Sequence, residues 1–444
     1  MPTRPRARAR ALTKKRHLPF RDHSCQHIHA HTRAHVGRAF ACSVYARVQK
    51  NERFFHRVGA PRVLARDGFE DGLFIPYDRL LKRGRVVRGS VTSVDAAAKT
   101  VSVSKPDGST STEQYDILVC ATGAVFPVPF EPLSQAASEA KAAIARLRDN
   151  VRSAAAVTVI GGGPVGCELV GEIKAAFPDK TVRLVHGGDK LLNAPGNGNL
   201  TDAFRARVLE GVRARGVEVL LNTTATVAAG TPTLANGVFG GGAAHSVTLS
   251  TGSSVSSDIT VLAFGSRFNA SAYQSGSLTS AVRADGSGLA TEATLQVTGF
   301  PNVFVIGDAA TLGDAKMAFI AARSHAPIAK KNILLLAQAL AGGRSAESVV
   351  PKLARHTPAA KGAMLIPDGP TGGLMAFGDK IMSGFLVKKL KAADLLVKRY
   401  ALPAPAPGQR AAVWPHAVWP HVHSKLPHTT PVAFIMPPTL QDKC

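Results

Sequence analysis

Three glycines form the motif in this sequence that is most specific for chemistry. Gly161, Gly163 and Gly166 lie between the apolar segment 157–160 and a helical pattern over residues 167–176. In that context Gly161 permits a tight turn, Gly163 lets the backbone approach a phosphate, and Gly166 lets helix and strand pack closely. The helix N-terminus adds N–H donors and partial positive charge. We expect this turn to bind a dinucleotide pyrophosphate, in preference to being a glycine-rich turn without a ligand.

The residues after the next strand bear on which dinucleotide binds. Segment 181–185 is predicted to be that strand, and an acid for the ribose 2′-hydroxyl of NAD is typical at its end. The sequence places His186 and Lys190 in this region instead. Either side chain could accept the 2′-phosphate of NADP(H), or simply be exposed, so the choice between NADH and NADPH stays open.

The elements around this motif predict an α/β fold, of which residues 157–215 are half of a Rossmann fold. The final helix carries five basic residues beside an apolar face, which is typical of a helix lying on lipid or of a solvated helix packed on its own domain. The expected strands are residues 85–94, 100–104, 115–123, 157–160, 181–185, 247–251, 258–265 and 302–307; the expected helices are residues 139–150, 167–176, 200–215, 315–340 and 384–400.

Two further segments, in this order around the glycine motif, resemble a known family. Residues 115–123 and 302–308 are similar to the second and third flavin-domain motifs of the pyridine-nucleotide:flavin oxidoreductases. Within that superfamily, residues 69–400 most resemble the branch that contains apoptosis-inducing factor and ferroptosis suppressor protein. The resemblance implies two Rossmann-like domains that bind FAD and NAD(P)H, plus a short C-terminal α+β segment. By the same match, the cofactor-binding residues are Gly161, Gly163, Gly166, His186, Ala121, Thr122, Gly123, Gly265, Gly307, Asp308 and Met317.

The resemblance also assigns roles near the reacting atoms. Glu168 is expected to face the region where the nicotinamide meets the flavin, and Lys316 to approach the flavin from the start of its next helix, so both are catalytic candidates. Glu172 matches an acid of the family or is a solvated helix residue. Met317 is equally explained by packing, and His325 by being a hydrogen-bonded interior histidine.

The resemblance departs from the family at the beginning of the chain. Nothing in residues 1–60 supplies the first strand, glycine turn and helix of the flavin domain, so we expect this domain to lack its opening βα unit. The expected organisation is a basic disordered or transit-like extension (1–50), the first part of the FAD-binding domain (51–150), the NAD(P)H-binding Rossmann domain (151–285), the second part of the FAD-binding domain (286–345), a C-terminal segment on the quinone and membrane side (346–402), and a disordered tail rich in Pro and His (403–444).

Charge and cysteine content narrow the function classes. Of the net charge of +24, residues 1–50 carry +11, from nine Arg and three Lys against one Asp. Residues 401–444 carry +2, and the remaining 350 residues carry +11. A basic body of this size favours anionic partners without separating a dinucleotide, lipid and nucleic acid, of which nucleic acid is the least expected. The five cysteines form no CxxC or CxxxxC pair, which argues against a disulfide-reductase mechanism. We expect no functional metal site, because the tail histidines lie in a Pro-rich segment that fixes no geometry.

These observations predict an FAD-dependent oxidoreductase that passes electrons from NAD(P)H through flavin to a quinone-type acceptor, with peripheral membrane contact through the basic final helix. One alternative is a type II NADH dehydrogenase. Another is a degenerate, flavin-free protein that binds nucleotide or associates with nucleic acid. The compartment is cytoplasmic and membrane-associated, or a plastid or mitochondrion if residues 1–50 are a transit peptide; the oligomeric state stays open.

Overall fold

The computed structural model describes residues 45–77, 85–127, 129–400 and 432–435. All of them belong to one compact unit, Ala41–Cys444. Residues 1–44 of the predicted extension therefore lie outside the described residues. Within the part that is described, no helix combines the length and the apolar character needed to cross a bilayer.

A six-stranded sheet forms the flavin-side half of this unit. Its order is β18 (Gln296–Val297), β19 (Phe300–Val305), β8 (Ile117–Cys120), β23 (Val432–Ile435), β1 (Tyr45–Gln49) and β4 (Arg85–Arg88). All neighbouring pairs are parallel except β18 with β19. Parallel sheets are buried on both faces, which agrees with the four consecutive buried residues of β8.

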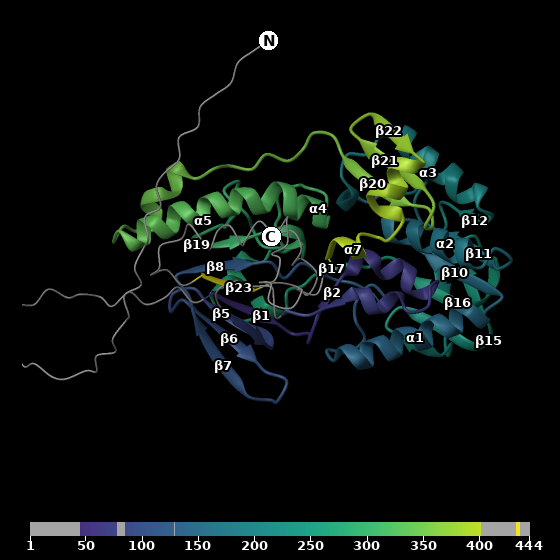
Figure 1. Cartoon of the computed structure of the whole chain (residues 1–444), viewed down its shortest axis with the longest axis horizontal. Coiled ribbons are helices and arrows are strands. Elements are labelled where there is room, and N and C mark those ends of the chain that lie inside the picture. Colours follow the sequence, from purple (N-terminus) through teal and green to yellow (C-terminus); the bar gives the residue numbers. More distant parts are fainter. Residues whose placement is uncertain (1–44, 78–84, 128, 401–431, 436–444) are drawn as a thin grey trace, which may run out of the picture. The chain divides into compact units, whose positions relative to one another are not determined.

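Two predictions about the ends of the chain need correction here. Strand β1 lies inside range 1–50, which was expected to be a disordered extension, and β23 lies inside range 403–444, which was expected to be a disordered tail. Figure 1 shows β23 between β8 and β1. Pairing with distant strands, and not local periodicity, orders these short segments, and therefore the sequence pattern did not indicate them.

A seven-stranded sheet contains the glycine motif. Its order is β12 (Val217–Leu220), β11 (Thr181–Val185), β10 (Ala156–Ile160), β16 (Ser254–Leu262), β15 (Val238–Leu249) and β13 (Ala225–Val227), and β14 (Thr233–Ala235) pairs with β15. The four strands from β12 to β16 are parallel. Strand β10 leads into helix α2 (Pro164–Ala176), and β11 leads toward helix α3 (Asp202–Ala214). The predicted βαβ unit is thus present, within a few residues of the expected bounds.

Other elements cover these sheets or join them. Gly89 separates β4 from β5, so the single strand expected over residues 85–94 is divided between two sheets. The remaining strands are β2 (Phe54–Phe55) with β3 (Phe74–Ile75), β5 (Ser90–Asp95) with β6 (Thr100–Ser104) and β7 (Thr110–Gln114), β9 (Ala124–Val125) with β17 (Arg267–Phe268), and β20 (Ala363–Pro367) with β21 (Gly373–Phe377) and β22 (Lys380–Ser383); the 3₁₀ segments include η1 (Arg57–Leu64), and helix α1 spans Ala137–Ser153.

The two helices predicted near the C-terminal end differ from expectation. The helix expected at 315–340 begins as α4 (Ala318–Ile320), passes through a π-helical turn at Ala321–His325 and continues as α5 (Ala326–Ala341). The helix expected at 384–400 is broken: α6 (Phe385–Val387) and a π-helical turn, Lys388–Ala392, are separated from α7 (Val397–Tyr400). Leu395 and Leu396 have φ of 47° and 68°, outside the right-handed helical region, and end the first helical run.

Candidate functional site

The glycine turn has the geometry that phosphate binding requires. Gly161 has φ of 122°, and a Cβ on Gly166 would lie 1.9 Å from the carbonyl oxygen of Gly161. Gly163 is the residue before α2, and a Cβ there would meet no atom within 4 Å. Gly161 and Gly166 are thus needed for the turn itself, whereas Gly163 keeps open the space in front of the helix N-terminus.

His186 closes the side of this turn. The backbone N–H of Gly162 donates to His186 Nδ1 over 3.2 Å, and Nε2 lies 2.9 Å from Asn193 Oδ1 and 3.0 Å from the carbonyl oxygen of Lys190. Nδ1 is therefore an acceptor, which leaves Nε2 as the donor to the two oxygens. Both ring nitrogens are occupied within the protein, and the Lys190 ammonium pairs with Asp202 at 2.7 Å. His186 therefore shapes the turn, and its contact with a 2′-phosphate stays a prediction.

The predicted flavin residues follow the carboxyl ends of two adjacent parallel strands. Val305 of β19 is in register with Cys120 of β8, so the turns 121–123 and 307–308 lie at the same edge of the sheet. Ligands of open α/β sheets bind at this edge. Thr122 accepts a hydrogen bond from the buried Tyr273 hydroxyl at 3.2 Å, and Gly123 has φ of 61°. The structure thus brings Ala121, Thr122, Gly123, Gly307 and Asp308 together.

Two cations, Arg57 and Lys316, and the imidazole of His325 lie near Asp308. Burial raises the pKa of its carboxyl, and Arg57, Lys316 and His325 act against that increase. The Lys316 ammonium donates to the carbonyl oxygens of Asp308 and Ala310 at 2.9 and 2.6 Å. Lys316 therefore holds the turn that carries Asp308, rather than extending freely toward a ligand.

Arg57 was not found from the sequence. It lies in η1, its guanidinium donates to Glu131 at 2.7 Å, and it stacks over Phe126 at 4.3 Å from the ring centroid. Burial lowers the pKa of Arg57, while Glu131 and Asp308 oppose that decrease. A half-buried cation next to the turn that is expected to hold a flavin can stabilise negative charge there.

Residues 315–317 lie between the two cofactor regions. The backbone N–H of Lys316 donates to the carbonyl oxygen of Gly196, and a Cβ on Gly198 would lie 3.1 Å from Ala315 Cβ. Met317 precedes α4 and packs against the larger apolar core. Packing therefore accounts for Met317 as the structure shows it. Gly265 has φ of 83° and nothing within 4 Å of an added Cβ, so it leaves open space after β16.

Glu168 is paired with a lysine from the C-terminal segment. Lys391 Nζ lies 2.6 Å from Glu168 Oε1, and the two side chains are 16% and 7% exposed. Burial raises the pKa of Glu168, Lys391 lowers it, and the nearby Glu172 raises it again. The sequence indicated Lys391 only as one basic residue of a helix that lies on lipid or packs on its own domain, and the structure places its ammonium against α2.

Glu172 is a buried ion-pair partner, so its interpretation as a solvated helix residue is wrong. Arg62 Nε and Nη2 donate to its two carboxylate oxygens at 2.7 and 2.6 Å. The same guanidinium donates to the carbonyl oxygens of Ala392 and Ala393 at 2.6 and 3.0 Å. Arg62 therefore ties η1, α2 and the C-terminal segment together one helical turn away from the Glu168–Lys391 pair.

His325 is a hydrogen-bonded interior histidine, as one of the two interpretations expected. Its Nδ1 accepts from the backbone N–H of Gly307 at 3.1 Å, and its Nε2 lies 3.2 Å from Asp314 Oδ2. The same oxygen lies 2.8 Å from Nε2 of His356. Burial tends to raise the pKa of Asp314, but the hydrogen bonds from both histidines lower it overall. This network holds the backbone of Gly307, and so stabilises the turn that follows β19 and carries Asp308.

Asp314, His325 and His356 also have the residue types of a metal centre. Their ligand atoms all lie within 4.8 Å of one another, and all three side chains are buried. A neutral histidine that accepts from Gly307 through Nδ1 must carry its proton on Nε2, however, and that nitrogen then has no lone pair for a cation. The donor set thus fits a hydrogen-bond network and not a cation. The tail histidines His416, His421 and His423 lie outside the described residues.

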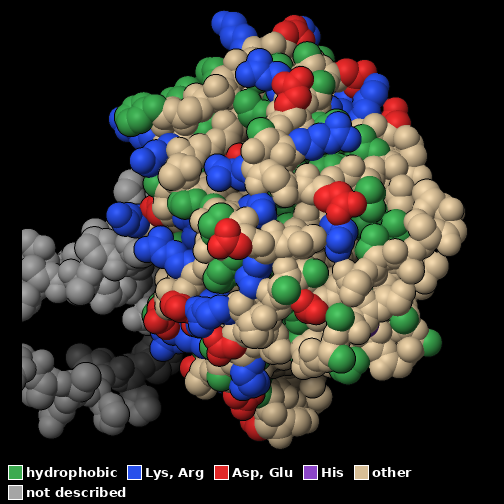
Figure 2. Space-filling view, turned by 90° about the vertical axis from the view of Figure 1, so that its right-hand side faces the viewer, with side chains coloured by type: hydrophobic (Ala, Val, Ile, Leu, Met, Phe, Trp, Pro, Cys, Tyr) green, Lys and Arg blue, Asp and Glu red, His purple; other side chains and the backbone are tan. Residues whose placement is uncertain are grey.

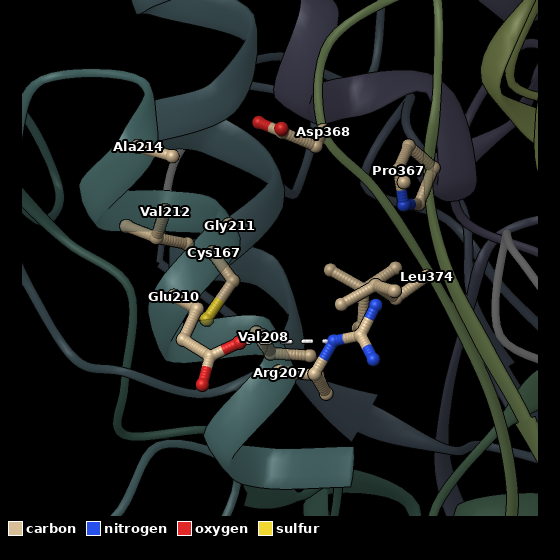
Figure 3. A pocket seen from close by; sticks show the side chains of 12 residues that line it. Cys167, Arg207, Val208, Glu210, Gly211, Val212, Ala214, Pro367, Asp368 and Leu374 are labelled. Carbon is tan, nitrogen blue, oxygen red and sulfur yellow. Dashed lines mark ion pairs between the residues drawn. The ribbon is translucent and has the colours of Figure 1, made fainter. Parts of the chain in front are cut away.

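A cavity of about 340 Å³ reaches α2 at Cys167, the residue after Gly166, but none of the three glycines of the turn lines it. It is bounded by α3, by residues of β20 and β21, and by Cys167 on α2, as Figure 3 shows. Burial raises the pKa of the Cys167 thiol, so this sulfur is a weak nucleophile. Because no predicted cofactor residue lines the cavity, we do not assign it to the nucleotide or the flavin.

Comparison with known proteins identifies the class. The chain matches the family model of the pyridine nucleotide-disulphide oxidoreductases over residues 44–339, about two thirds of its length, and it belongs to that family. It is accordingly an oxidoreductase that uses FAD and NAD(P)H.

Individual relatives place it more closely. It is 30% identical to apoptosis-inducing factor homolog B of Dictyostelium discoideum over 372 residues, which cover 80% of this chain and 89% of that protein. It is 29% identical to human ferroptosis suppressor protein 1 over 290 residues, which cover 65% and 73% of the two chains. Among solved structures, reduced Bacillus anthracis CoADR-RHD has the same fold, with a TM-score of 0.52 and 19% identity over 78% of this chain and 58% of that one.

The described residues fit both cofactors in part. The open space at Gly163 fits a dinucleotide phosphate, and Thr122, Gly123 and Asp308 at one sheet edge fit a flavin and its ribityl chain. Bound FAD would accept a hydride from NAD(P)H and release electrons singly or in pairs. Residues 436–444, which follow β23 in the sequence, contain no glycine.

Proposed function

We propose that this oxidoreductase delivers the electrons of NAD(P)H to a quinone-type acceptor at a membrane surface. The observation that carries the proposal is the C-terminal segment, which exposes apolar and basic side chains outward and pairs with α2 inward. Phe385 and Leu386 of α6 are 76% and 39% exposed, and Lys388 and Lys389 follow them as exposed residues.

The same segment reaches α2, the helix that follows the glycine turn, through Lys391. Burial raises the pKa of Glu168, and the Lys391 ammonium counteracts this increase. Lys391 therefore favours the ionised form of this carboxylate, which lies in the first half of α2. Arg62 holds the backbone of residues 392 and 393 against Glu172. An acceptor that enters beside α6 would therefore approach groups whose positions are fixed by two buried ion pairs.

The cysteines support an acceptor other than a disulfide. The two that the structure describes, Cys120 and Cys167, are free and buried; Cys120 ends strand β8 of one half of the molecule, and Cys167 lies on helix α2 of the other half. Burial raises the pKa of Cys120 to about 12, which keeps it a thiol at neutral pH. Neither residue has the exposed thiolate that dithiol exchange requires.

The described surface does not favour nucleic acid as the partner. On the face that Figure 2 shows, Lys and Arg side chains are interspersed with Asp and Glu instead of forming one continuous basic area. Ion pairs such as Arg152 with Asp67 neutralise part of the charge locally. Binding of a phosphate backbone is typically supported by a clustered basic face.

The test is acceptor specificity in the presence and absence of membrane. The purified full chain, supplied with FAD, is assayed with NADH and with NADPH against a short-chain soluble quinone, ferricyanide and cystine. A long-chain quinone in anionic phospholipid vesicles is then compared with the soluble quinone for wild type, for the double variant F385S/L386S, and for V350S as an exposed apolar control.

We expect quinone reduction to exceed cystine reduction, and F385S/L386S to lose about tenfold in rate with the vesicle quinone only. V350S should behave as wild type in every assay. Faster reduction of cystine than of either quinone would refute the proposed acceptor. Equal rates of F385S/L386S and wild type with vesicles would refute the membrane contact alone.

A further inference from the structure

Strands β1 and β8 of the six-stranded sheet do not pair with each other. Each pairs in parallel with β23, which comes from near the other end of the chain. In the part of the molecule that is described, β23 is the one strand that joins the β1–β4 pair to the β8–β19–β18 group. The space between β1 and β8 is therefore a slot of one strand's width.

The register shows that β23 fits this slot along its whole length. Val432 lies opposite Tyr45 and Ile117, and Ile435 lies opposite Val48 and Cys120. All four residues of β23 pair on both sides, as residues in the centre of a parallel sheet do. The slot thus accepts an extended segment in one direction and one register.

An empty slot would be costly to this sheet. Ile117, Leu118, Val119 and Cys120 of β8 are all 0% exposed, and Val48 of β1 is 4% exposed. Buried backbone N–H and C=O groups that lose their partners cost about as much as lost hydrogen bonds, and the loss would repeat along both edges. The sheet therefore depends on an occupant.

The sequence around β23 suits an occupant that attaches only by strand pairing. The segment reads Pro431-Val-Ala-Phe-Ile-Met-Pro437, so proline stands close to both ends of a four-residue strand. Proline has no N–H to donate, and so limits the ladder to the residues between. Residues 401–431 separate β23 from α7, and no short turn connects it to either neighbouring strand.

We infer that the gap between β1 and β8 is a strand-acceptor site for an extended peptide segment, and that Val432–Ile435 of the same chain fills it. The carboxyl end of β8 leads directly into Ala121–Gly123, so the occupant also fixes one side of the flavin edge. This inference does not depend on which electron acceptor the protein uses.

Cys120 offers a local probe of the slot, and Cys167 an internal control. Both thiols are buried and free, but Cys120 lies opposite Ile435 whereas Cys167 lies on α2 in the other half of the molecule. The full chain is compared with chains ending at residue 430 and at residue 435. Maleimide labelling of each cysteine is mapped by mass spectrometry, and amide hydrogen exchange is measured for β1, β8 and β10.

Removal of residues 431–444 should speed the labelling of Cys120 by about tenfold or more, and the exchange of β1 and β8 amides similarly, while Cys167 and β10 keep their protection. The chain ending at residue 435 should match the full chain. A synthetic peptide of residues 429–437 should restore Cys120 protection in the shortened chain. The same peptide with A433P should not, because it lacks one ladder N–H.

Unchanged protection of Cys120 after removal of residues 431–444 would overturn the inference. If the shortened chain does not fold, it is refolded with each peptide, and recovery with the wild-type peptide alone supports the inference, whereas equal failure with both overturns it. A dimer that disappears on removal of residues 431–444 would show that a second copy supplies the strand, and would overturn the assignment to the same chain.

Discussion

The Arg62–Glu172 pair is the most sensitive point of the junction between α2 and the C-terminal segment. The two side chains are 1% and 3% exposed and share two hydrogen bonds of 2.6 and 2.7 Å. The substitution E172Q keeps the size of the side chain and removes its charge. It leaves Arg62 as a buried cation without a carboxylate partner, bonded to the glutamine oxygen and to the carbonyl oxygens of residues 392 and 393.

Breaking one side of a buried pair of this kind costs about 3–5 kcal/mol, since the remaining charge is desolvated without compensation. We expect a value near the lower end, because the glutamine oxygen still accepts one hydrogen bond from Arg62 and two carbonyls still face the guanidinium. The double variant R62M/E172L replaces the pair by apolar side chains of similar volume. It should be less destabilised than E172Q, because no buried charge is left alone.

The assay is urea denaturation followed by circular dichroism, with the free energy of unfolding compared at a common slope. The control is E210Q, because Arg207 and Glu210 form an exposed pair at 3.7 Å with side chains 57% and 72% exposed. That control should change stability by no more than about 0.5 kcal/mol. An E172Q loss below about 1 kcal/mol, or a double variant less stable than E172Q, would refute the reasoning from burial.

Three further outcomes are expected. The variant G163A should keep its stability but bind NAD(P)H about tenfold or more weakly, because its Cβ enters only the open space before α2. The variant G166A should also unfold at lower temperature, because its Cβ would lie 1.9 Å from the Gly161 oxygen. Titration calorimetry measures the binding and thermal melts measure the stability; equal effects of both substitutions would contradict this prediction. The variant K391M should lose more free energy of unfolding at about pH 8 than at about pH 5. Without Lys391, burial raises the pKa of Glu168 further, so the folded state is penalised as the pH rises and the carboxyl must ionise. A loss of stability that does not depend on pH would exclude this cause. The variant H325Q should retain FAD about tenfold more weakly, because the Gly307 N–H loses its acceptor; the flavin fluorescence of released cofactor measures this. In a separate test, Zn²⁺ should not raise the melting temperature of the wild type. A rise would show that Asp314, His325 and His356 bind metal.

Local sequence determined the nucleotide half of the protein. The strand predicted at 181–185 has the observed bounds, and helix α2 begins within three residues of its expected start, because the spacing of apolar residues and glycines fixes a βαβ unit without distant partners. The φ of 122° at Gly161 and the close contact at Gly166 follow from the same local motif. The turns at 121–123 and 307–308 follow ordinary buried strands that end in glycine, and only the family resemblance predicted a flavin role for them.

Tertiary structure alone decided the rest. Arg62 and Glu172 are 110 positions apart, and Lys391 and Glu168 are 223 apart, so nothing in their local sequence distinguishes a buried ion pair from solvated helix residues. Strand β23 is four residues long and lies in a segment rich in Pro and His, so its periodicity is too short to predict a strand. Its structure comes from the main-chain groups of β1 and β8, which lie on either side of it only once the chain is folded.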